Sequence, residues 1–132
     1  MAMKIVLDTH AAYFYVTASQ MGATGQSILA SLSRDELVIS DVTLIELARL
    51  IAEGTITLRT HPFEWLEQFA SAFTVQPVTP AIAHVAANYT FAHKDPNDRQ
   101  ILATAQVLGL SLITKDRKLT RLAPTVGVRV VW

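Results

Sequence analysis

The sequence predicts a single α/β domain in which a parallel sheet is covered by helices on both faces. Short β-like runs alternate along the chain with segments whose apolar residues recur at helical spacing. A length of 132 residues suits one domain of ordinary size, and an apolar content of 51% favours a compact core over a disordered chain. We therefore expect a central parallel sheet of four to five strands, flanked by helices, in one domain spanning residues 1–132.

The strand candidates are short apolar runs bounded by polar or turn residues, as buried strands of a parallel sheet usually are. The four clearest runs are Lys4–Leu7, Leu37–Ile39, Ser111–Thr114 and Val128–Val131, and Val75–Val78 is a weaker fifth candidate.

Helices are predicted between these runs. Apolar residues repeat at helical spacing in Leu44–Ile51 and Ile101–Leu108, and Gly109 is placed to end the second helix. Two further helix candidates are Phe63–Phe73 and Ala81–Tyr89, and Thr79 and Pro80 open the second. The segment that starts at Tyr13–Val16 and runs without charge to Ser33 is also expected to form core-facing helices, with a loop at its MGATGQS stretch.

Composition excludes several classes of site. The chain has no cysteine, which excludes disulfides, a thiolate zinc site and a cysteine nucleophile. Its net charge is zero, so charge alone gives no argument for nucleic-acid binding. The uncharged stretches contain many polar residues or prolines and do not resemble membrane spans. The N-terminus lacks the pattern of a signal peptide, and we therefore expect a cytoplasmic protein with no membrane segment.

Acidic residues follow the predicted strands where those strands end. KIVL is followed by Asp8, LVI by Ser40 and Asp41, and SLIT by Lys115 and Asp116. Because parallel strands present their carboxyl ends at one edge of a sheet, Asp8 and Asp116 should share a rim. Glu46 and Asp98 lie in the early turns of predicted helices and should project toward the same rim.

Each acid also has a purely structural explanation. Asp8 could cap the next helix, Asp116 could be a turn residue, and Glu46 could form a capping box with Thr43. In HKDPNDRQILATAQ, Asp95 fits the N-cap, Pro96 the first helical position and Asp98 the third. Asp98 also lies on the inward stripe of that helix, where a charge needs a partner or a metal.

Several carboxylates on one rim favour a metal site. Close carboxylates repel each other and raise one another's pKa, and a divalent cation removes that repulsion. Oxygen ligands without cysteine or paired histidines favour Mg²⁺ or Mn²⁺ over zinc. Carboxylate-bound Mg²⁺ can orient a water and stabilise charge on a phosphoryl group, so phosphodiester hydrolysis is the chemistry that fits best.

Four segments, taken in order, resemble the successive motifs of a known family. LDTH, SDVTLIE, HKDPNDRQILATA and TKDRKL are similar to the motifs of PIN-domain ribonucleases, specifically the VapC-type toxins of bacterial toxin–antitoxin pairs, over nearly the whole chain. The resemblance implies a Mg²⁺-dependent endoribonuclease in which Asp8, Glu46, Asp98 and Asp116 are the catalytic and metal-binding acids.

The same resemblance implies supporting residues and partners. Thr9, Ser40 and Thr114 would place hydroxyl groups near the metal or phosphate, and Arg99 would pair with an acid or a phosphate. Asn97 departs from the family, whose members usually carry an aromatic or aliphatic residue there. The implied partners are an RNA substrate and a VapB-like antitoxin docked on the apolar helices, in a homodimer or a toxin–antitoxin hetero-oligomer.

Two other functions remain open from the residues. The domain could be a non-catalytic PIN-like protein-binding module whose acids only cap helices. It could also be a phosphatase or phosphotransfer domain using Asp8, although His10 stands where haloacid-dehalogenase-type enzymes need a second aspartate. A catalytic histidine is disfavoured, because His10 and His93 near the rim have no apparent nucleophile partner.

Overall fold

The computed structural model describes residues 4–19, 21–91 and 94–132. Five parallel strands form one sheet in the spatial order β3-β2-β1-β4-β5. This arrangement confirms the predicted α/β fold with a parallel sheet of four to five strands. The strands are β1 (Ile5–Leu7), β2 (Leu37–Ser40), β3 (Thr74–Gln76), β4 (Ser111–Ile113) and β5 (Val130–Val131).

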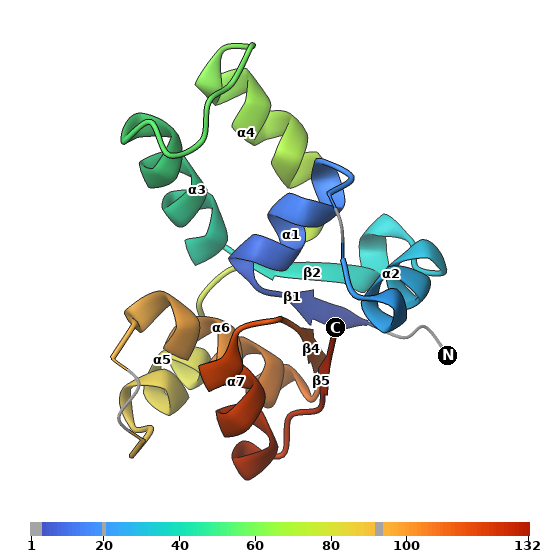
Figure 1. Cartoon of the computed structure of the whole chain (residues 1–132). Helices are drawn as coiled ribbons and strands as arrows, with labels where there is room; N and C mark the ends of the chain where they lie inside the picture. Colours follow the sequence, from blue (N-terminus) through green and yellow to red (C-terminus); the bar gives the residue numbers. More distant parts are fainter. Residues whose placement is uncertain (1–3, 20, 92–93) are drawn as a thin grey trace.

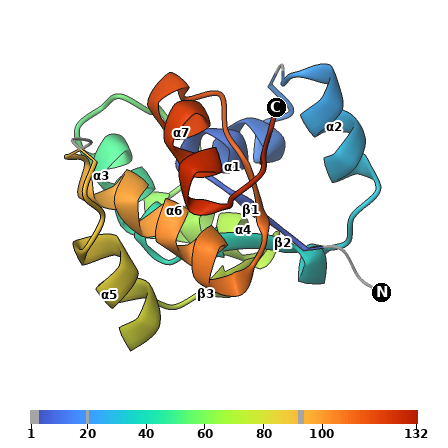
Figure 2. The same ribbon diagram turned by 90° about the horizontal axis from the view of Figure 1, so that it is seen from below.

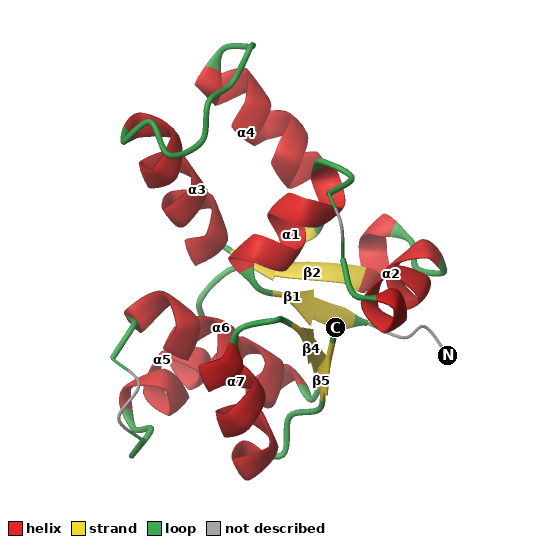
Figure 3. Ribbon diagram, in the orientation of Figure 1, coloured by secondary structure: helices red, strands yellow, loops and turns green. Residues whose placement is uncertain are grey.

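Helices cover both faces of this sheet (Figures 1 and 3). In Figure 1, α1, α3 and α4 lie above the strands and α5, α6 and α7 lie below them; Figure 2 views the fold from below. None of the helices in the described segments has both the length and the apolar character that a bilayer span requires. The helices are α1 (Thr9–Val16), α2 (Ala23–Ala30), α3 (Val42–Ala52), α4 (Pro62–Ser71), α5 (Pro80–Ala87), α6 (Pro96–Leu108) and α7 (Arg117–Leu122), with the 3-10 turns η1 (Arg34–Glu36) and η2 (Ala123–Val126).

The two faces of the sheet form two separate cores. Ile5 and Leu7 of β1 pack with residues of α1, α2, α3 and α4, whereas Val6 packs with residues of α6 and α7. This division follows from the alternation of side chains along a strand. All three residues of β1 are buried, which explains why the central strand is a continuous apolar run without alternation.

The strand order places a crevice beside β1. From β1 the chain moves to β2 and β3 on one side, and it then returns to add β4 and β5 on the other side of β1. The helix after β1 therefore joins one core, through Ala11 and Ala12, while the helix after β4 joins the other, through Leu119. Sheets of this kind bind ligands at such a reversal point, outside the carboxyl ends of the strands. Here that point lies between β1 and β4.

Most predicted helix boundaries are confirmed. Asp95 caps α6 by accepting hydrogen bonds from the N–H groups of Asn97 (2.9 Å) and Asp98 (3.3 Å). Gly109 ends the same helix in the left-handed conformation, with φ of 68°. Thr79 caps α5 and Pro80 opens it, as predicted. Tyr13 on α1 packs against the core that contains Ile5 and Leu7, as expected for a core-facing helix.

One local prediction was wrong, and one helix was not predicted. The MGATGQS stretch is not a loop, because α2 begins inside it at Ala23. The segment after Asp116, where a turn was one alternative for that residue, forms the helix α7. That helix is short and carries four charged or polar residues in RKLTRL, so it offers little apolar periodicity to recognise.

Glycines at the start of α2 allow Trp132 to approach the helix. A Cβ atom on Gly22 would lie 2.5 Å from the Trp132 carbonyl carbon, and one on Gly25 would lie 3.0 Å from the same atom. Both distances are shorter than an ordinary carbon contact. These glycines therefore serve close packing within a helix, a role that composition alone does not distinguish from a loop.

We predict that Gly22→Ala destabilises the protein by about 1–3 kcal/mol, because the added methyl group must displace Trp132. Urea unfolding followed by tryptophan fluorescence measures the change. Ser27→Ala, an exposed substitution in the same helix, is the control and should change the free energy of unfolding by less than about 0.5 kcal/mol. Equal effects of the two substitutions would contradict the packing role of Gly22.

Candidate active site at the β1–β4 crevice

Asp8 lies directly after β1 and is only 5% exposed. Its Oδ1 accepts a hydrogen bond from the Ala11 N–H at 2.8 Å, so the side chain caps α1 as predicted. Its backbone N–H donates to the Ile113 carbonyl oxygen at 3.1 Å, and its Oδ2 accepts a short hydrogen bond from the Thr114 hydroxyl. Both carboxylate oxygens and the backbone of Asp8 are thus fixed against α1 and β4.

Burial raises the pKa of the Asp8 carboxyl above its ordinary value, because desolvation disfavours the charged form. Hydrogen bonds from Thr114 and from the Ala11 N–H, and the positive charge of His10, lower this pKa but do not cancel the effect of burial. The nearby Asp116 carboxylate raises the pKa further. A cation beside Asp8 would therefore relieve a cost that the fold imposes on the ionised carboxylate.

Asp116 approaches Asp8 through Thr114. The Thr114 hydroxyl donates to Asp8 and accepts a hydrogen bond from the Asp116 N–H at 3.0 Å. The Asp116 Oδ1 accepts from the Leu119 N–H at 2.9 Å, so Asp116 is the N-cap of α7 and not a simple turn residue. One buried hydroxyl therefore connects the two strand ends and the two predicted ligands.

Asp8, His10, Lys115 and Asp116 line a pocket of about 240 Å³ at this crevice. One water occupies about 30 Å³ in the liquid, so the pocket has room for several waters or a hydrated ion. His10 and Lys115 were not among the predicted site residues. The signal that points to them is their position, since each lies within two residues of an acid that ends a strand.

Glu46 and Asp98 do not line this pocket. Glu46 lies in the second turn of α3 and Asp98 is the third residue of α6, and both side chains are partly exposed. Within residues 4–19, 21–91 and 94–132, no three His, Asp or Glu side chains are grouped closely enough to hold a metal ion jointly. The structure thus brings together Asp8 and Asp116, while the inclusion of Glu46 and Asp98 stays a prediction.

The predicted supporting hydroxyls are all buried near the strand ends. The Thr9 and Thr43 hydroxyl oxygens lie 3.2 Å apart and join α1 to α3. The Ser40 hydroxyl accepts from the Val42 N–H at 3.3 Å at the start of α3. Because Thr43 lies inside α3, it is not the N-cap, and the capping box suggested for Thr43 and Glu46 is wrong.

Arg99 contacts backbone carbonyl oxygens, and its predicted pairing with an acid or a phosphate stays a prediction. Its guanidinium donates to the carbonyl oxygens of Ala86 (3.1 Å), Tyr89 (2.8 Å) and Phe91 (3.4 Å). The Arg99 Cζ also lies 5.7 Å and 5.4 Å from the ring centroids of Tyr89 and Phe91. These contacts attach the α5–α6 connection to α6 and thereby stabilise the start of the helix that carries Asp98.

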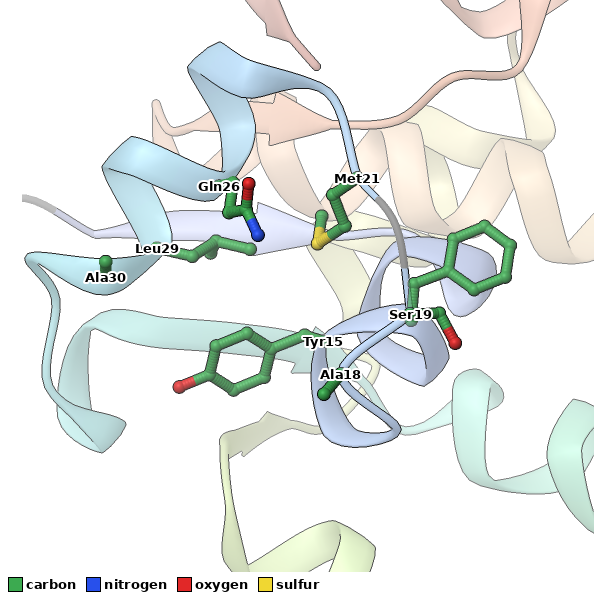
Figure 4. A pocket seen from close by; sticks show the side chains of 8 residues that line it. Tyr15, Ala18, Ser19, Met21, Gln26, Leu29 and Ala30 are labelled. Carbon is green, nitrogen blue, oxygen red and sulfur yellow. The ribbon is translucent and has the colours of Figure 1, made fainter.

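A second, apolar pocket lies between α1 and α2, away from the carboxylates. Figure 4 shows Tyr15, Met21 and Leu29 directed toward its interior. Gln26, Ser19 and the Tyr15 hydroxyl supply its few polar groups. This pocket has the chemistry of a docking site for an apolar side chain and not that of a reaction centre.

The raised pKa of Asp8 predicts that Asp8→Asn stabilises the metal-free protein at pH 7. A carboxyl whose pKa is raised by folding contributes stability below its ordinary pKa of 3.8, and that contribution is lost as the pH rises through the raised value. The variant should therefore unfold at higher urea concentration than wild type at pH 7 in EDTA, and the difference should shrink toward pH 3.5. Asp35→Asn, an exposed substitution, is the control and should change the free energy of unfolding at pH 7 by less than about 0.5 kcal/mol. A variant that is less stable than wild type at pH 7 would contradict the desolvation cost.

Comparison with known proteins agrees with this geometry. The family model described as "PIN domain" matches residues 5–124, which include all four predicted acids. Over 116 residues, the chain is 34% identical to Ribonuclease VapC22 of Mycobacterium tuberculosis, covering 87% of this chain and 88% of the relative.

Solved structures share the fold at lower identity. The DNA-bound VapBC structure from Salmonella typhimurium matches with a TM-score of 0.72 and 20% identity, covering 98% of this chain and 97% of that chain. FitAcB from Neisseria gonorrhoeae matches with a TM-score of 0.68 and 21% identity, covering 97% of this chain and 96% of that chain. Because both identities are below 25%, these two matches concern the fold alone. The family model and the 34% identical relative carry the assignment, and the chain belongs to the PIN-domain family.

Proposed function

We propose that this protein is a metal-dependent endoribonuclease that acts as the toxin of a toxin–antitoxin pair and hydrolyses phosphodiester bonds of RNA. The observation that carries this proposal is the pairing of Asp8 and Asp116 across Thr114 in the β1–β4 pocket. A ribonuclease relative at 34% identity supports RNA as the substrate.

The donor set of the pocket fits a hard divalent cation. Asp8 is a desolvated carboxylate and Asp116 lies close enough to raise the pKa of Asp8. Mg²⁺ is usually held by one or two carboxylates together with waters and substrate phosphates, so this pair suffices as the protein's share. Asp8 and Asp116 would hold Mg²⁺, with Mn²⁺ as an alternative. The bound ion would supply an activated water and stabilise negative charge on the phosphoryl group.

The residues of the chain itself hold the reacting groups in place. Thr114 and the Ala11 N–H fix the orientation of the Asp8 carboxylate, so that little reorganisation is needed when the phosphate binds. The Leu119 N–H donates to one oxygen of Asp116, and within the described residues the other oxygen accepts no hydrogen bond, so it could bind a ligand. Thr9 and Ser40 support the loops that carry Asp8 and α3.

Glu46 and Asp98 complete the proposed acidic set. Helix α3 follows β2 directly, so its early turns, and with them Glu46, belong to the carboxyl edge of the sheet. Helix α6 leads into β4 and spans roughly 20 Å at 1.5 Å per residue, so its first turn and Asp98 lie toward that same edge. Glu46 and Asp98 would then join Asp8 and Asp116 as residues that hold the metal ion.

The proposed partners are a VapB-like antitoxin and a second copy of the chain, in a cytoplasmic homodimer or hetero-oligomer. The apolar pocket between α1 and α2 (Figure 4) supports the antitoxin, because a short apolar segment could seat its side chains there. A solved structure that shares this fold is a toxin–antitoxin complex from Klebsiella pneumoniae, which also supports an antitoxin partner.

Cleavage of a mixed RNA substrate tests the proposal. Purified wild-type protein should cleave RNA in the presence of Mg²⁺, and EDTA should stop this cleavage. Asp8→Asn and Asp116→Asn should each reduce the rate by at least about 100-fold, because even loss of a partner of a metal ligand costs 10–100-fold. Glu46→Gln and Asp98→Asn should give losses of similar size if these acids belong to the metal set.

The matched control is Asp35→Asn, which removes an exposed carboxylate on η1 and should cleave at the wild-type rate. Cleavage that survives Asp8→Asn and Asp116→Asn would identify a contaminating nuclease and overturn the proposal. Circular dichroism of each variant establishes that the fold is intact.

A further inference from the structure

The pocket that holds Asp8 and Asp116 also contains a lysine whose role the proposed metal site leaves open. Lys115 lies between Thr114 and Asp116 in the loop after β4, and its side chain is exposed. It lines the same pocket as the two carboxylates, together with His10. The pocket is therefore lined by two carboxylates and by the cationic side chain of Lys115.

Two aromatic rings fix the position of the Lys115 ammonium. The Nζ atom lies 4.6 Å from the ring centroid of Phe14 and 5.8 Å from that of Trp132. The two rings contact each other edge to face, with centroids 6.3 Å apart. A cation within about 6 Å of an aromatic face is attracted by the ring. Phe14 on α1 and Trp132 after β5 thus hold a flexible side chain at the pocket.

The ammonium keeps its hydrogen-bond donors available. Within the described part of the chain, Lys115 forms no ion pair with Asp8 or Asp116 and no hydrogen bond through Nζ. An aromatic face attracts a cation but accepts no full set of hydrogen bonds. The three donors of Lys115 can therefore reach an anion in the pocket.

Charge balance indicates which anion would bind. The two carboxylates that line the pocket already balance one divalent cation, even without Glu46 and Asp98, and a bound phosphodiester adds one more negative charge. A lysine ammonium beside that position compensates the added charge, and lysine binds phosphate as a point charge without demanding one orientation. We propose that Lys115, held by Phe14 and Trp132, is a phosphate-binding residue that contacts an RNA phosphate at the edge of the carboxylate pocket. This inference rests on the proposed ribonuclease function.

The salt dependence of RNA binding tests the proposal without requiring cleavage. Fluorescence anisotropy of a labelled 12-nucleotide oligouridylate is measured in EDTA over a series of salt concentrations. Lys115→Met keeps the aliphatic stem but removes the charge, and we expect it to raise the Kd by about three- to tenfold. It should also reduce the slope of log K against log salt by about 0.7, the amount associated with one phosphate contact on a single strand. Lys115→Arg should restore most of both quantities.

Lys4→Met is the matched control. Lys4 is exposed at the amino end of β1, on the opposite edge of the sheet from the pocket, and its loss changes the net charge by the same amount. Lys4→Met should leave the slope at the wild-type value. In Mg²⁺, Lys115→Met should raise KM more than it lowers kcat, which a purely structural role of the lysine would not produce.

Equal slopes for Lys115→Met and Lys4→Met would overturn the inference and assign Lys115 to aromatic packing alone. A wild type without measurable RNA affinity in EDTA would also overturn it, because a phosphate contact by an ammonium needs no metal. The two proposals fail separately. A smaller salt slope in Lys115→Met, without Mg²⁺-dependent cleavage by wild type, would support the phosphate contact and reject the nuclease. Mg²⁺-dependent cleavage with an unchanged slope in Lys115→Met would support the nuclease and reject the phosphate contact.

Discussion

The buried hydroxyl of Thr114 is the contact on which the rest of the site depends. It donates to Asp8 at the end of β1 and accepts from the Asp116 N–H at the start of α7, so two strand ends and two helix starts meet at one oxygen atom. The strand order makes this meeting possible, since β1 and β4 are neighbours whose following helices join opposite cores. Without the hydroxyl, a desolvated Asp8 carboxylate would lose its partner on β4.

Helix capping and the proposed metal binding use the same side chains here. Asp8 caps α1 and Asp116 caps α7, each through a hydrogen bond from a backbone N–H three residues later. A cap fixes the side chain of a loop residue to a rigid helix, and it places the carboxylate near the positive end of the helix dipole. The sequence left a structural and a functional role open for each acid, and the cap geometry shows that the two roles are compatible at these two positions. Asp95, by contrast, only caps α6 in this structure.

How much the sequence could predict depended on how local the signal was. The strands, the Asp95 cap and the Gly109 end of α6 follow from neighbouring residues, and all are confirmed. The short helix α7 was missed because its six residues carry little periodicity, and α2 was misread because Gly22 and Gly25 serve a contact with Trp132 over 100 residues away. The carbonyl partners of Arg99 could not be predicted either. A guanidinium near acids suggests an ion pair, and because every residue has a backbone oxygen, the sequence does not show which ones Arg99 contacts.

The long separation between Asp8 and Thr114 has a consequence for how the protein folds. Their hydrogen bond joins residues 106 positions apart, and pairing of β1 with β4 closes a loop that contains most of the chain. Closing so large a loop is entropically costly before its contacts form, and chains rich in such distant contacts fold slowly. The proposed metal site therefore exists only once β1 and β4 have paired, and local helix formation alone cannot assemble it.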